Sequence, residues 1–245
     1  MWADWLDPYL PKGVVNHERF SGTIYRTHTV KEVKKQSGSS QSGRVRVVCR
    51  ECNNGWMSVL QSEAKPILVP LLKGERIGLH KKAQATLAAW IAMFTMVAEH
   101  QSRTPRKVAI TTAHRRYLMD NRTVPSDWKI WIGYYERQSW PRVYVHNTLP
   151  VSSEENSINH TEDGFPLPNT QTTTFVVGQL YSHVLSTAVR GGINRQRVQV
   201  PGVVQLWPFK ASPVGWPRTP MTDEQAEGIA MAYIQGAVRR SKGAA

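Results

Sequence analysis

Two stretches of the chain carry apolar residues at helical spacing. Residues 81–100 are apolar on nearly every face of a helix, which predicts a buried helix in the interior of a domain. Near the C-terminus, apolar residues recur with helical period from Ala226 to Val238. Thr222 and Gln225 have the spacing of a capping box at the start of this second helix. A further short helix is predicted at residues 111–120.

The middle of the chain instead favours strands, because β-branched and aromatic residues dominate it. Strands are predicted at residues 128–135, 142–146, 172–184 and 203–209. Segments rich in Ser, Asn, Gly and Pro separate them, and the longest covers residues 154–170. This spacing predicts an antiparallel sheet.

The N-terminal part has shorter elements. Two β-type runs are predicted at residues 22–33 and 43–48, on either side of the polar loop KKQSGSSQSG. The second run leads directly into CRECNNGWMS (residues 49–58), after which Trp56, Val59 and Leu60 lie at helical spacing. Pro66 is predicted to end that helix or to start another turn. The order of strand, cysteine turn and helix outlines a ββα-metal unit.

These patterns together predict an α+β protein with two parts. Residues 1–75 would form an incomplete ββα-metal unit, and residues 76–245 an α+β domain with an antiparallel sheet, a buried helix and a C-terminal helix. A chain of 245 residues is long enough for one large domain or two small ones.

Charge is the clearest global feature. Lys and Arg number 31 against 18 acidic residues, a formal net charge of +13. Such an excess favours a polyanionic partner, and DNA is the partner we predict. The candidate phosphate-binding residues are Lys34, Lys35, Arg44, Arg46 and Arg50. The alternative is a basic protein whose charges are simply solvated.

Cysteine usage and hydropathy bear on the compartment. The chain has two cysteines, three positions apart, which argues against a disulfide framework and favours a reducing cytoplasm. The most apolar stretch, residues 87–98, is too short to span a bilayer, and the N-terminus lacks the pattern of a signal peptide. The histidines after residue 81 show no spacing typical of metal ligands.

The CxxC pair at Cys49 and Cys52 allows three interpretations. It could be half of a four-ligand structural zinc site, because two thiolates at this spacing bind one face of the ion. It could be a redox dithiol, which normally opens a helix after a core strand. It could also be a packed turn without a metal. Trp56 could likewise stack on a base, although a tryptophan in the first turn of a short helix more often packs in a core.

RVVCRECNNGWMS resembles the second half of the HNH (His-Me finger) endonuclease motif, in the branch with zinc-binding CxxC pairs, and the resemblance extends over residues 1–65 through WADWL. It implies hydrolysis of DNA phosphodiester bonds with Mg²⁺ or another divalent cation, and a structural zinc at Cys49 and Cys52. It places Asn53 at the family's last metal ligand, with Asn54 orienting that ligand or contacting a phosphate. Alternatively, both asparagines cap the helix.

The same resemblance also implies that parts of the motif are missing. The family's first CxxC and its Glu-His base would precede Trp2, and its central asparagine has no counterpart near Arg44 and Arg46. His17 and His28 are the nearby histidines, and neither follows an acidic residue. We therefore expect either a chain that begins too late or a catalytically inactive relative. The alternatives to an endonuclease are a non-catalytic nucleic-acid-binding protein and a phage-associated protein.

Overall fold

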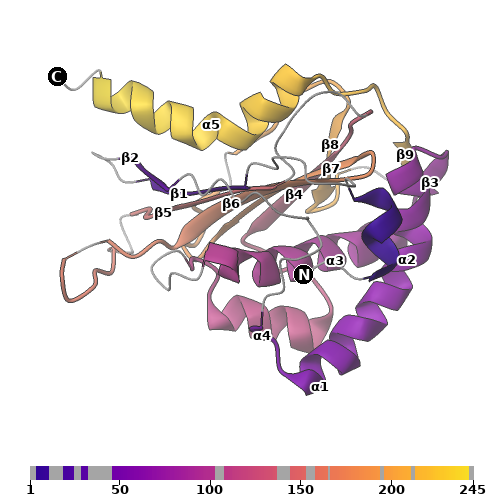
Figure 1. The fold of residues 1–245 in the computed structure, drawn as a ribbon, viewed down its shortest axis with the longest axis horizontal. Coiled ribbons are helices and arrows are strands. Elements are labelled where there is room, and N and C mark those ends of the chain that lie inside the picture. Colours follow the sequence, from indigo (N-terminus) through magenta and orange to yellow (C-terminus); the bar gives the residue numbers. More distant parts are fainter. Residues whose placement is uncertain are drawn as a thin grey trace.

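The computed structural model describes residues 4–10, 19–24, 29–32, 46–102, 108–136, 144–152, 158–164, 166–193, 196–210 and 213–242. In this part of the chain, a seven-stranded sheet has helices on both of its faces (Figure 1). The predicted α+β class is confirmed, since helices accompany a largely antiparallel sheet. None of the helices in these residues combines the length and the apolar character that a membrane crossing requires.

The large sheet has the strand order β2-β1-β5-β6-β7-β4-β8. Its strands are β1 (Arg19–Ile24), β2 (Thr29–Glu32), β4 (Trp128–Tyr134), β5 (Tyr144–Leu149), β6 (Thr170–Val177), β7 (Leu180–Thr187) and β8 (Val203–Trp207). Neighbouring strands are antiparallel except β1 and β5, which are parallel. A small second sheet pairs β3 (Ile77–Leu79) with β9 (Val214–Trp216).

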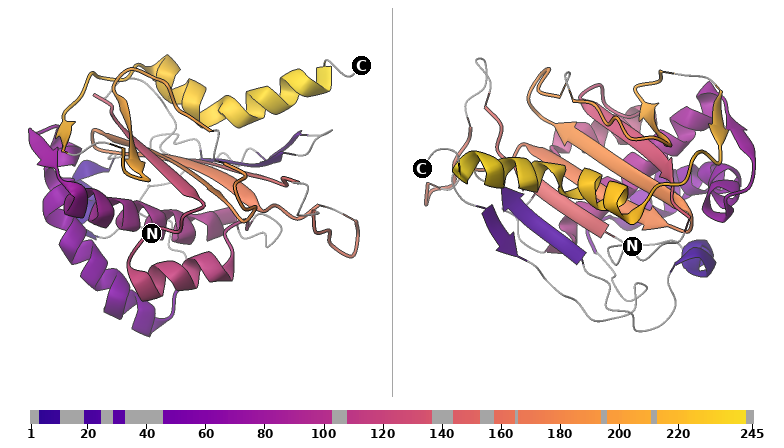
Figure 2. Two further views of the ribbon diagram at one scale, coloured as in Figure 1. Left: turned by 180° about the vertical axis from the view of Figure 1, so that it is seen from behind. Right: turned by 90° about the horizontal axis from the view of Figure 1, so that it is seen from above.

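The helices lie on both faces of the large sheet. They are α1 (Arg50–Cys52), the π-helical turn η2 (Asn53–Met57), α2 (Ser58–Lys73), α3 (Lys81–Ala98), α4 (Thr112–Asn121) and α5 (Asp223–Lys242), with short 3-10 helices η1 (Asp4–Tyr9) and η3 (Glu99–Ser102). Helices α2, α3 and α4 cover one face, and α5 crosses the other (Figures 1 and 2).

Three details of the predicted elements are corrected. The run at 172–184 is not one strand but the hairpin β6–β7, which turns at Gly178 with a positive φ of 53°. The run at 22–33 likewise covers parts of two paired strands, the end of β1, which begins at Arg19, and all of β2. Of the strand predicted at 43–48, residues 46–48 belong to no strand, and residues 43–45 lie outside the described residues.

Pro66 does not end its helix, contrary to the first of the two predicted alternatives. Helix α2 continues through Pro66 and Pro70 to Lys73, and it ends where Gly74 adopts a left-handed φ of 70°. The apolar face of α2 is buried against α3, with Leu60, Ala64, Leu68 and Leu71 almost fully buried. Packing of this face compensates for the backbone hydrogen bonds that the prolines cannot make.

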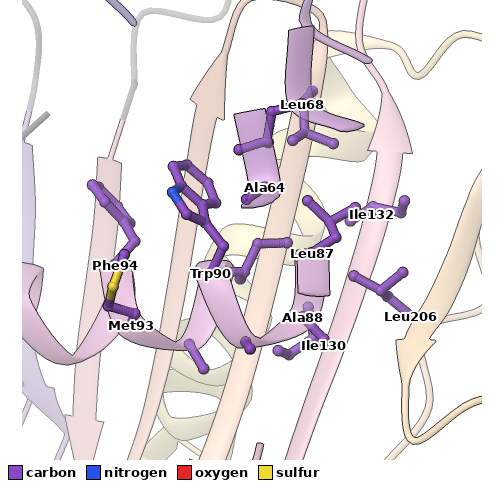
Figure 3. Close-up of a cluster of buried hydrophobic side chains, with 14 of the residues drawn as sticks. Ala64, Leu68, Leu87, Ala88, Trp90, Met93, Phe94, Ile130, Ile132 and Leu206 are labelled. Carbon is purple, nitrogen blue, oxygen red and sulfur yellow. The ribbon is translucent and has the colours of Figure 1, made fainter. Parts of the chain in front are cut away.

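The main hydrophobic cluster lies between the sheet and these helices. Figure 3 shows side chains of α2 and α3, among them Leu68, Leu87 and Trp90, meeting Ile130 and Ile132 of β4. The rings of Phe94 and Phe175 lie 4.5 Å apart, while Trp90 contacts both. Leu6 and Leu10 from the N-terminal segment belong to the same cluster. The division of the chain at residue 75 remains a prediction, but the two parts share this cluster and, through β1 and β5, one sheet.

Candidate functional site

The cysteine pair opens the first helix of the α1–α2 region. Cys49 is the N-cap of α1, where its sulfur accepts a hydrogen bond from the backbone N–H of Cys52 at 3.2 Å. The backbone N–H of Asn53 donates to the Cys49 carbonyl at 3.0 Å and continues the helix. The capping position is therefore filled by a cysteine, so the alternative in which Asn53 and Asn54 cap the helix is wrong.

Both asparagines lie on the exposed side of η2, one turn into the helical segment. Asn53 Nδ2 donates to Asn54 Oδ1 at 3.2 Å, which orients one amide against the other. Gly55 follows with non-helical angles (φ −91°, ψ −114°), so the axis changes direction within η2. Asn53 Oδ1 accepts no hydrogen bond from a described residue. This oxygen is thus accessible from solvent beside the cysteine pair.

The two thiols have different environments. Cys49 is exposed, and its sulfur is hydrogen-bonded by Cys52. The pKa of Cys49 is lowered chiefly by the backbone N–H of Cys52 and next by the Cys52 thiol. The same contact raises the pKa of Cys52, whose half-buried side chain packs against the main hydrophobic cluster. Cys49 is therefore the sulfur that more readily becomes a thiolate, the form that binds metals.

Trp56 anchors this turn to the rest of the molecule. Its half-buried ring packs against the main hydrophobic cluster, as the core interpretation predicts. The guanidinium of Arg122 lies 5.0 Å from the ring centroid. Arg122 caps the C-terminal end of α4, so it reaches the turn from a distant part of the sequence.

Exposed arginines therefore lie both within the turn and beside it. Arg46 and Arg50 are exposed in the segment around Cys49, and exposed Arg122 covers Trp56. We call residues 46–57 together with Arg122 the arginine-flanked turn. Lys34, Lys35 and Arg44, the other predicted phosphate-binding residues, lie outside the described residues. Sequence reasoning missed Arg122, because no local pattern places the end of α4 beside the cysteines.

The described residues supply only part of a metal site. Within them, no group of three or more His, Cys, Asp and Glu side chains is arranged to hold an ion. Cys49 and Cys52 provide two sulfurs, and a tetrahedral zinc site takes two more ligands. His17 and His28 lie outside the described residues. Structural zinc and a catalytic divalent cation remain predictions.

Three of the later histidines, His114, His146 and His183, make hydrogen bonds within the fold. His146 Nδ1 bonds to Thr173 Oγ1 and His183 Nδ1 to Thr174 Oγ1, each at 2.8 Å between neighbouring strands. Burial lowers the pKa of His183 to about 4, so this ring is neutral at physiological pH. His114 accepts a hydrogen bond from the Trp128 indole at 3.3 Å.

In comparisons with protein-family models, with curated proteins and with solved structures, none matches this chain.

Proposed function

We propose that this chain is a DNA-binding protein of the HNH type, which contacts the phosphate backbone through the arginine-flanked turn. The observation that carries the proposal is the placement of exposed Arg46, Arg50 and Arg122 around a helix start that holds two cysteines. The net charge of +13 supports a polyanionic partner.

The turn has the chemistry that this role needs. Guanidinium groups bind phosphate oxygens in bidentate geometry, and each phosphate contact releases condensed counterions. A zinc ion held by Cys49 and Cys52 would fix the start of the helix, and two further ligands would complete its shell. A reducing compartment such as the cytoplasm would keep both thiols available.

The test is DNA affinity measured against salt concentration. Replacing Arg46, Arg50 and Arg122 together with alanine should weaken binding and should reduce the slope of log K against log salt by about 0.9 for each phosphate that the variant no longer neutralises. The matched control replaces Arg76, Arg190 and Arg218, which are exposed and lie elsewhere. Both triple variants remove the same charge, so an equal loss of affinity in the two would contradict a site at the turn.

Phosphodiester hydrolysis is the second candidate function. It is favoured by Asn53 Oδ1, a hard oxygen exposed beside the arginines that could bind a divalent cation. Supercoiled plasmid incubated with the chain and Mg²⁺ or Mn²⁺ tests it. Binding without nicking is the result expected for a non-catalytic protein. Nicking that Asn53→Ala abolishes would instead establish the endonuclease.

A further inference from the structure

A cavity of about 490 Å³ lies between α5 and the segment of residues 196–200. Trp131 of β4 and His183 of β7 form its floor, and their rings lie 5.7 Å apart. These two residues are register partners, and they line the cavity together with residues of α5. Figure 1 shows α5 and α2 on opposite faces of the sheet, and the cavity is lined by α5, so it lies across the sheet from α2. Its volume falls within the range of small-molecule sites.

One wall of the cavity is fixed to the sheet. Lys129, on β4, donates from Nζ to the carbonyl of Gln196 at 3.0 Å, at the start of the wall segment. Val198 packs against the cluster of Trp131 and Leu185, and a hydrogen bond from Val203 N to Val200 O closes the end of the segment. A wall held at both ends is preformed, which lowers the entropic cost of binding.

The opposite wall comes from α5, which presents no side chain at Gly228. Gly228 and Ile229 line the cavity from this helix. A Cβ atom added at Gly228 would have no neighbour within 4 Å, so open space lies directly in front of the helix backbone. Val198 and Val200 also line the cavity and pack against the cluster that contains Ile229, so a ligand would meet apolar groups on both sides.

Polar groups are placed at the bottom and at the rim. The Nδ1 atom of His183 is held by Thr174, so Nε2 is the ring nitrogen left for a ligand. Gln199 and Gln225 also line the walls; Gln225 Oε1 accepts from Thr222 N in the capping box, so its Nε2 group is the donor that faces a ligand, while the Gln199 amide can both donate and accept. Exposed Arg197, whose Nη1 donates to the Gln196 carbonyl at 2.8 Å, supplies a positive charge at the rim. The cavity thus combines apolar walls, amide groups and one guanidinium.

We propose that this cavity binds a 5′-mononucleotide, either free or at the end of a strand. The planar base would lie between the apolar walls, the glutamine amides would bond to its edge, and Arg197 would bind the phosphate. The site goes beyond the proposed contact with the DNA backbone, and it uses none of the same residues.

Calorimetric titration of the full chain tests the site with AMP, CMP, the two nucleosides and a 5′-phosphorylated dinucleotide. The nucleotides should bind at least tenfold more tightly than the nucleosides. Gly228→Leu should reduce affinity at least tenfold, because its side chain fills the cavity. Gly215→Leu is the matched control, since an added Cβ there also meets nothing within 4 Å and Gly215 lies outside the cavity. This control should bind as the unmodified protein does.

Two further variants test whether Arg197 binds the phosphate. Arg197→Ala should lower nucleotide affinity to that of the nucleoside, while Arg190→Ala, exposed and outside the cavity, should leave it unchanged. Binding of the dinucleotide alone would identify a strand end as the ligand. Absence of binding by every phosphorylated probe, or undiminished binding by folded Gly228→Leu, would overturn the proposal. The triple arginine variant at the turn should bind AMP normally, which keeps this test independent of DNA binding.

Discussion

The Arg122 guanidinium lies 5.0 Å from the centroid of the Trp56 indole ring and so connects the end of α4 to the cysteine turn. Arg122 adopts a left-handed conformation with φ of 53°, unusual for a residue with a side chain. The ring in turn packs against the main hydrophobic cluster. A surface cation is thereby held beside a site that is far from it in sequence.

Replacement of Arg122 by glycine should weaken DNA binding while leaving the free energy of unfolding nearly unchanged. Glycine relieves about 1 kcal/mol of left-handed strain, and removal of the exposed cation–π interaction costs about the same. The free energy of unfolding, measured by urea denaturation, should therefore change by less than about 1 kcal/mol. DNA affinity at low salt should fall nonetheless. Unchanged affinity would remove Arg122 from the interface.

The two cysteines should differ in reactivity. Cys49 is exposed and its pKa is lowered by the Cys52 backbone N–H and thiol, whereas the pKa of half-buried Cys52 is raised. Brief treatment with iodoacetamide at neutral pH should therefore alkylate Cys49 several-fold faster, because the thiolate is the nucleophile. Peptide mass spectrometry measures the two rates. Zinc added in excess should slow alkylation at Cys49 if the pair binds the metal, and equal protection in Cys52→Ser would contradict a shared site.

Glu99 should make stability depend on pH. Burial raises the pKa of this carboxyl from 4.5 to about 7, against the opposing effects of Arg115 and of the backbone N–H groups of Ala109 and Ile110. Because the folded-state pKa lies above the unfolded value, the folded protein holds an extra proton between about pH 4.5 and 7. The stability contributed by Glu99 therefore falls as the pH rises through this window.

The Glu99→Gln variant isolates this effect. The free energy of unfolding of the unmodified protein, minus that of the variant, should fall by about 2 kcal/mol between pH 5 and pH 8. Urea denaturation at several pH values provides the measurement, and the other titrating groups cancel in the difference. A difference that rises with pH would mean that the carboxylate is instead stabilised in the folded protein.

Gly178 should not tolerate a side chain. It has a φ of 53°, and an added Cβ would lie 2.5 Å from the Leu72 carbonyl oxygen at the end of α2. The backbone N–H of Gly178 also donates to the carbonyl oxygen of Tyr9 at 3.1 Å, and the backbone N–H of Gln179 donates to the carbonyl oxygen of Leu72 at 3.0 Å. Gly178→Ala should therefore destabilise the fold by roughly 2–4 kcal/mol, through strain and displacement of the α2 end.

The matched control for this change is Gly215→Ala. An added Cβ at Gly215 meets nothing within 4 Å, and its φ is not in the left-handed region. Thermal and urea denaturation should give a change of less than about 1 kcal/mol for this variant. Equal effects at the two glycines would show that the hairpin turn is not packed against α2 and Tyr9.

Local patterns were sufficient for several elements. The capping box at α5 is present, with Thr222 N donating to Gln225 Oε1 at 3.0 Å and Gln225 N to Thr222 Oγ1 at 3.2 Å. The buried helix predicted at residues 81–100 is α3. Such features depend on neighbours within a few residues, so they can be seen in the sequence.

The candidate site could be predicted only in part. The spacing of Cys49 and Cys52 allowed a zinc site, a redox dithiol or a packed turn, and the sequence alone also allowed a cap at Asn53 that the structure assigns to Cys49. The cavity beneath α5 left no local signal, because Trp131, His183 and Gly228 come from three separate elements.

The sequence by itself determined the α+β class, the interior helix, the capped terminal helix and the basic character of the chain. Only the tertiary structure decided that α2 passes through Pro66, that β1 pairs in parallel with β5, and that Arg122 lies over Trp56. The physical reason is the separation along the chain of the residues that interact. Capping, periodicity and charge are properties of adjacent residues, whereas strand partners and buried faces are selected by the free energy of packing segments that are distant in the chain.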